Sequence, residues 1–99
     1  MKLCKVVGFA TASIKREGLS SYKLLILKPI DDAGRPTGES FLAVDTVGAG
    51  LSEVVAVTVG PPATHALADK NLPVDAAVIA ICDHVTINNK EVDTRTKED

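Results

Sequence analysis

The glycine-rich stretch DTVGAGLSEVV comes nearest to a chemical site in this sequence. Amides of a glycine-rich turn can bind phosphate, and two carboxylates at its margins, Asp45 and Glu53, could act as an acid and a base. The phosphate motifs are incomplete: there is no Gly-Lys-Ser/Thr, and Glu53 stands where a dinucleotide-binding turn needs its third glycine. An apolar run, Val54–Val59, follows instead of a helix. We interpret the stretch as a close-packed turn whose acids cap loop amides or line a polar opening.

A second group of reactive residues is the run Cys82, Asp83 and His84. On a strand, side chains alternate between faces, so Cys82 and His84 would share one face and could act as a nucleophile and its base. The sequence shows no third group to orient such a pair, and we expect a polar strand end instead. Neither Cys4 nor Cys82 has a CxxC companion, so we expect two buried small side chains.

One histidine, His65, lies in the segment PPATHALADK, which opens with prolines and predicts the one short helix of the chain. His65 stands four residues before Asp69, so the two side chains could pair on the helix surface. A metal site would need a third ligand on that face, which the sequence does not show. We therefore expect no catalytic residue, no metal site and no cofactor.

Composition narrows the possible partners. The chain has 99 residues, enough for one domain, and 45% of them are hydrophobic. Its net charge of −2 and its three aromatic residues disfavour nucleic acid, which requires basic grooves with stacking platforms. Lys5 and Gly8 interrupt the first apolar run, so we predict no signal peptide, and no run is long enough to span a membrane. We expect a cytoplasmic protein that buries surplus apolar surface by association.

The apolar runs predict an all-β fold. Gly8 lies within the first run and predicts a bulge or a bend there. Asp, Gly and Pro in 31–39 predict a hairpin loop. Five strands and one short helix indicate a small five-stranded closed β-barrel over residues 1–92, followed by a charged tail at 93–99. The predicted strands are Leu3–Ile14, Tyr22–Ile30, Ser40–Asp45, Val54–Val59 and Pro73–Ile87.

Two motifs together resemble a known family. DTVGAGLSE at 45–53 and PVDAAVIAICD at 73–83, preceded by MKLCKVVG and GLSSYKLLIL, are similar to the EutN/CcmL family, the vertex proteins of bacterial microcompartment shells. The resemblance runs from Met1 to about Val92. The chain departs from the family pattern in having Ser52 and Ala80 where glycine is common, and prolines at 61–62. Because serine disfavours a positive φ, we expect the loop at Ser52 to differ slightly in shape.

The resemblance implies a barrel similar to an OB-fold, assembled as a homopentamer that closes the corners of a shell tiled by hexameric shell proteins. Such a protein is structural and not an enzyme, although family members also form six-membered rings in some crystals. The loop would then lie near the ring axis, where we expect its small residues to relieve crowding between subunits and Ser52 and Glu53 to line an opening. This candidate assembly loop consists of Gly48, Ala49, Gly50, Leu51, Ser52 and Glu53.

Two other interpretations stay open on the residues alone. An OB-type binding module would engage a small ligand or single-stranded nucleic acid, and would need aromatic platforms in a basic groove. An enzyme would use Cys82 with His84, or the acids of the glycine-rich loop. Unusually fast labelling of Cys82 by a thiol reagent would favour the enzyme.

Overall fold

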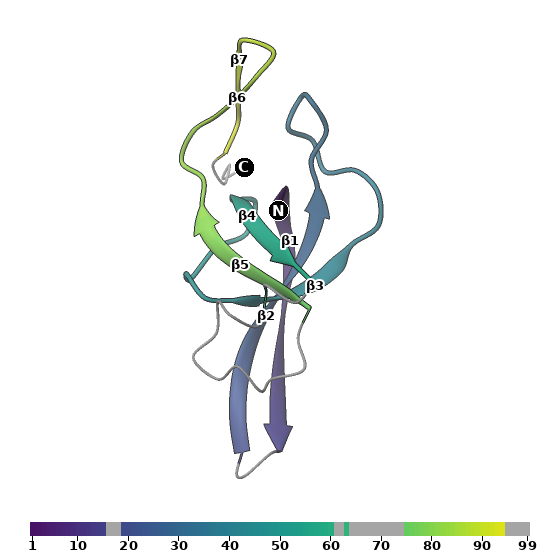
Figure 1. The fold of residues 1–99 in the computed structure, drawn as a ribbon, viewed down its shortest axis with the longest axis vertical. Coiled ribbons are helices and arrows are strands. Elements are labelled where there is room, and N and C mark those ends of the chain that lie inside the picture. Colours follow the sequence, from purple (N-terminus) through teal and green to yellow (C-terminus); the bar gives the residue numbers. More distant parts are fainter. Residues whose placement is uncertain (16–18, 61–62, 64–74, 95–99) are drawn as a thin grey trace.

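The computed structural model describes residues 1–15, 19–60, 63 and 75–94. Five strands close into a barrel in the order β1-β2-β3-β5-β4, and β4 returns to pair with β1 (Figure 1). β3 and β5 run parallel, whereas every other neighbouring pair in the barrel is antiparallel. The predicted all-β fold with a five-stranded closed barrel similar to an OB-fold is thus confirmed. The strands are β1 (Lys2–Lys15), β2 (Leu19–Pro29), β3 (Phe41–Asp45), β4 (Val54–Val59) and β5 (Ala76–Ile81).

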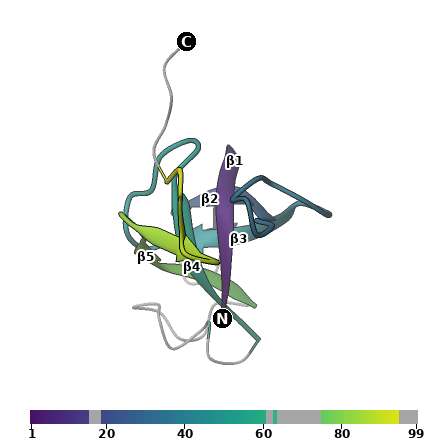
Figure 2. The same ribbon diagram turned by 90° about the horizontal axis from the view of Figure 1, so that it is seen from above.

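The long strand β1 closes the barrel because it pairs on both sides. It pairs with β2 along its length and, over Lys2–Lys5, with β4, and Figure 2 shows the five barrel strands from above. The β1–β2 register shifts between Val6 and Gly8, which marks a bulge that bends the strand. A Cβ on Gly8 would lie 3.2 Å from Cδ1 of Ile26, so glycine relieves crowding at the bend. The bend predicted at Gly8 is confirmed.

The barrel core is built almost wholly from aliphatic side chains. Leu25 and Leu27 of β2 point inward with the period of two that a strand imposes, and burying each contributes about 1.5–3 kcal/mol. In β4, Val55 faces this core, whereas its neighbour Val54 is buried in a second cluster outside the barrel. The other large side chains that are fully buried in this core are those of Cys4, Val6, Val57 and Val78.

The prediction of one long strand over Pro73–Ile87 is wrong. β5 ends at Ile81, and β6 (Val85–Ile87) pairs with β7 (Lys90–Val92) in a separate two-stranded sheet. Asn88 and Asn89 connect them with φ values of 53° and 63°, the left-handed region that asparagine tolerates in tight hairpins. Apolar periodicity continues from β5 into β6 and does not reveal that the strand changes its partner.

The β6–β7 hairpin packs on the loop between β2 and β3, and both extend from the same end of the barrel (Figure 1). Val92 contacts this loop at Gly34, whose φ is +81°, and is buried in the second cluster with Val54 and Val85. The predicted hairpin loop at 31–39 is confirmed, since it joins the antiparallel strands β2 and β3. Oδ1 of Asp31 accepts hydrogen bonds from the amides of Arg35 and Ala33 at 3.0 and 2.9 Å. These bonds, chiefly that from Arg35, lower the pKa of the Asp31 carboxyl.

The short helix predicted at 61–70 lies outside the described residues apart from Ala63, and His65 and Asp69 lie outside them too. Within the part of the chain that the structure describes, no helix has the length and apolar character needed to cross a membrane.

The contact between Gly34 and Val92 yields a first prediction. A Cβ on Gly34 would lie 2.1 Å from Cγ1 of Val92, whereas a Cβ on Gly38, whose φ is also positive at +78°, would meet nothing within 4 Å. Both Gly34→Ala and Gly38→Ala should incur the cost of a left-handed alanine. Gly34→Ala should lower the free energy of unfolding by about 1–3 kcal/mol more, because of overpacking. Denaturant unfolding of the two variants measures this difference, and equal losses would contradict the packing.

Candidate functional site

Asp45, the last residue of β3, organises the first half of the glycine-rich loop. Its Oδ1 accepts hydrogen bonds from the amides of Val47 and Gly48 at 3.0 Å and of Ala49 at 3.3 Å. The side chain is only 3% exposed, so these bonds replace its hydration. The prediction that this acid caps loop amides is confirmed. Its Oδ1 therefore faces the backbone of its own loop.

Glu53 organises the second half of the loop. Its Oε1 accepts a hydrogen bond from the amide of Gly50, and its own amide donates to the Gly50 carbonyl at 3.2 Å. The loop then joins β1 at the bulge, because the amide of Val6 donates to the Glu53 carbonyl at 3.0 Å and the Val6 carbonyl accepts from the amide of Ser52 at 2.8 Å. Both acids predicted to border the loop therefore hold its backbone in place.

Ala49 does not lie where the sequence suggested. Its side chain is 1% exposed and belongs to the core cluster of its own barrel. The expectation that Ala49 relieves crowding between subunits is therefore wrong, because the loop folds back and inserts this methyl group into the barrel. Gly48 is exposed, Leu51 is 46% exposed, and Ser52 and Glu53 are half-buried. The loop residues that are exposed on the surface of the barrel therefore lie on either side of Ala49.

Ser52 adopts the backbone conformation that glycine would favour. Its φ is +68°, in the left-handed region, which costs a residue with a Cβ about 1–2 kcal/mol. Sequence reasoning expected serine to oppose a positive φ at this position and to change the loop. The structure keeps the positive φ, and the hydrogen bond from the Ser52 amide to the Val6 carbonyl helps to hold it.

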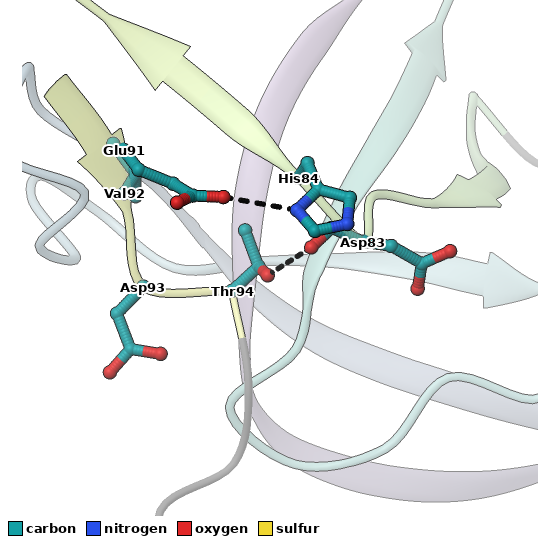
Figure 3. A pocket seen from close by; sticks show the side chains of 6 residues that line it. All are labelled: Asp83, His84, Glu91, Val92, Asp93 and Thr94. Carbon is teal, nitrogen blue, oxygen red and sulfur yellow. Dashed lines mark hydrogen bonds and ion pairs between the residues drawn. The ribbon is translucent and has the colours of Figure 1, made fainter.

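The run Cys82 to His84 forms no catalytic pair on a strand face, because it lies between β5 and β6, outside any strand. Cys82 packs against the second apolar cluster, whereas the exposed His84 ring places Nδ1 3.0 Å from Oε1 of Glu91 (Figure 3). An exposed pair of this kind contributes less than about 1 kcal/mol. Sequence reasoning missed Glu91 because the β6–β7 hairpin that brings it close was not predicted.

An open hollow of about 410 Å³ lies beside this pair and is lined by residues 83, 84 and 91–94. The hydroxyl of Thr94 donates to the Asp83 carbonyl at 2.7 Å, while the carboxylates of Asp83 and Asp93 point away from the pair of His84 and Glu91 (Figure 3). Among the described residues, no three His, Cys, Asp or Glu side chains are arranged to hold a metal ion. The lining groups do not converge on a common point.

The two cysteines differ in environment. Cys4 is fully buried in the barrel, and this burial raises the pKa of its thiol from 9.0 to about 11, with a smaller opposing effect from the charge of Lys2. Cys82 is half-buried, so the expectation of two buried cysteines holds fully only for Cys4.

Two phenylalanine rings are each in contact with the ammonium group of a lysine. Nζ of Lys2 lies 4.7 Å from the ring centroid of Phe41, and Nζ of Lys23 lies 4.6 Å from that of Phe9. These are cation–π contacts. One face of each ring is therefore in contact with an ammonium group.

Comparison with known proteins agrees with this small closed barrel. Residues 1–83 match the family model described as ethanolamine utilisation protein EutN/carboxysome. The carboxysome shell vertex protein CcmL of Synechococcus elongatus is 39% identical over 92 residues, which cover 93% of each chain. The structure of Gloeobacter violaceus CcmL superposes with a TM-score of 0.82 at 36% identity, covering 96% of this chain and 98% of that one.

A pentameric relative is also similar. The structure of the GrpN pentameric microcompartment shell protein from Rhodospirillum rubrum matches with a TM-score of 0.70 at 38% identity, covering 84% of this chain and 94% of that one. The fold defines a class of small closed β-barrels similar to the OB-fold. Within that class, the chain belongs to the EutN/CcmL family.

The strained serine yields a second prediction. Ser52→Gly should raise the free energy of unfolding by about 0.5–1 kcal/mol, because relief of the left-handed conformation exceeds the entropy that glycine adds to the unfolded chain. Ser40→Gly is the matched control, since Ser40 is exposed and is not among the residues with positive φ. That variant should be neutral or destabilised in the same urea titration. A Ser52→Gly protein that is less stable than the parent would contradict the strain.

The buried thiol yields a third prediction. Because the pKa of Cys4 is raised, its thiol stays protonated at pH 8, and it should react with a thiol reagent only as fast as the protein opens. The half-buried Cys82 should react first. The contribution of Cys4 to stability is full below pH 9 and is lost as the pH rises toward 11, because the unfolded thiol ionises first. Mass-resolved labelling checks the order, and prompt labelling of Cys4 in the folded protein would contradict its burial.

Proposed function

We propose that the protein is a structural subunit of a bacterial microcompartment shell, in which five copies form a ring that closes a vertex. Family membership and the similarity to a pentameric shell protein support this role. The observation that carries most weight is the close match of the whole barrel to a shell vertex protein, at a TM-score of 0.82. The loop acids bond their own backbone, which agrees with a structural and non-enzymatic role.

An apolar row on the outer face of the barrel supports association into a ring. Leu42 of β3 is 52% exposed and pairs in register with Ile26 of β2, which in turn pairs with Gly8 beside the exposed bulge residue Val7. In a ring, one face of each subunit meets a different face of its neighbour. A standard interface buries roughly 800 Å² per partner, and this row would form part of one side of it.

Within this role, we place the candidate assembly loop near the ring axis. Gly48 and Leu51 are its exposed members and would meet the neighbouring subunits, while Ser52 and Glu53 are half-buried beside them. We further propose that the rim of the ring contacts hexameric shell proteins, as a vertex requires. The vertex unit would be a single domain over residues 1–92 with a short tail at 93–99.

Native mass spectrometry of the purified chain tests the ring. At micromolar concentration and moderate ionic strength, the main species should have five times the mass of the 10.4 kDa chain. A protein that stays monomeric or dimeric under these conditions is not a vertex ring, and the proposal would then be abandoned.

The apolar row yields a fourth prediction. Leu42→Lys places a charge where the interface is expected to exclude water, and should cost at least about 2 kcal/mol per contact. The ring should dissociate at concentrations where the parent stays assembled, while the circular dichroism of the barrel is unchanged. Thr86→Lys, on the exposed face of β6, is the control and should leave the ring intact. If Leu42→Lys assembles like the parent, the row does not lie in the interface.

A further inference from the structure

The ammonium group of Lys23 joins three separate parts of the chain. Lys23 lies on β2, and its Nζ is 3.5 Å from Oδ2 of Asp45 and 3.2 Å from the carbonyl oxygen of Ala49. The same Nζ lies 4.6 Å from the centroid of the Phe9 ring on β1. The end of β3, the middle of the glycine-rich loop and the β1–β2 hairpin therefore share one contact point.

The two carboxylate oxygens of Asp45 have different partners. Oδ1 accepts from the loop amides of Val47, Gly48 and Ala49, whereas Oδ2 faces Lys23. Because the carboxylate is only 3% exposed, leaving its charge without a cation would be costly. Lys23 supplies that cation while its own side chain stays 48% exposed, so its ammonium keeps part of its hydration.

The methyl group, the amide and the carbonyl of Ala49 each make a contact that fixes its position. Its methyl group lies in the barrel core, its amide donates to Asp45, and its carbonyl accepts from Lys23. A residue fixed in this way determines how its neighbours leave the barrel. The exposed members of the loop, Gly48 and Leu51, stand on either side of it, so their position depends on the contact with Lys23.

We propose that Lys23 is a positioning residue for assembly, which holds the Asp45–Glu53 loop in the shape that neighbouring subunits require. This inference rests on the proposed role as a ring-forming shell subunit. A lysine suits the position because its three donors can address a carboxylate, a carbonyl and a ring face from a single point charge. An uncharged side chain of similar length would fill the same space without holding the loop.

Lys23→Met tests the proposal, because methionine keeps the apolar stem and removes the charge and the donors. Lys28→Met is the matched control: Lys28 is on the same strand, and among the residues that the structure describes its side chain makes no hydrogen bond or ion pair. Amide hydrogen exchange of the peptide at 45–53 reports on the loop, and native mass spectrometry reports on the ring. If Lys23→Met does not fold, Lys23→Gln takes its place with the same expected direction.

In Lys23→Met, the loop peptide should exchange at least tenfold faster than in the parent, while peptides from β4 and β5 keep their rates. The ring should also dissociate at a concentration at least tenfold higher, and Lys28→Met should match the parent in both measurements. Faster exchange throughout the barrel would indicate a general loss of stability and would overturn the positioning role.

An unchanged exchange rate of the loop peptide in Lys23→Met would also overturn the proposal. So would a loop peptide that exchanges faster while the ring dissociates at the same concentration as in the parent. The parent protein separates these failures from failure of the proposed function. If the parent forms no ring, the shell role and the assembly role of Lys23 both fall, whereas a parent ring with an unaffected Lys23→Met ring overturns only the inference about Lys23.

Discussion

Closure of the barrel by β1 is the constraint on which the rest of the structure depends. One strand must pair with β2 on one side and β4 on the other, and the bulge between Val6 and Gly8 bends it enough to do so. The backbone of Val6, beside that bulge, pairs with Ser52 and Glu53 of the glycine-rich loop. The bulged part of β1 that allows the barrel to close therefore also anchors one end of the glycine-rich loop, which we propose faces neighbouring subunits.

The other end of the loop depends on electrostatics. Asp45 gathers three amides around one nearly buried carboxylate oxygen, and Lys23 balances the charge of the other oxygen. A loop held in this way loses little conformational freedom when a neighbour binds it, and such preorganisation favours association. The small aliphatic core also favours association. It leaves other apolar residues, such as Leu42, exposed on the outer face of the barrel, where a neighbouring subunit could cover them.

Much of this fold follows from local pattern in the sequence. Strand runs, the bend at Gly8 and the capping role of Asp45 were predictable, because each depends on neighbours in the chain. The β6–β7 hairpin, the burial of Ala49 and the contacts of Lys23 were not, since they depend on residues brought together by barrel closure. The conformation of Ser52 was mispredicted because tertiary hydrogen bonds outweigh its intrinsic preference.

A cryo-electron microscopy structure of the assembled protein tests the central claim most directly. The account predicts a five-fold ring in which Gly48 and Leu51 approach the axis and Leu42 is covered by a neighbouring subunit. Each barrel in that ring should keep the Val6 contacts that anchor the loop. A ring in which these residues all face solvent, or particles of a single barrel, would contradict it.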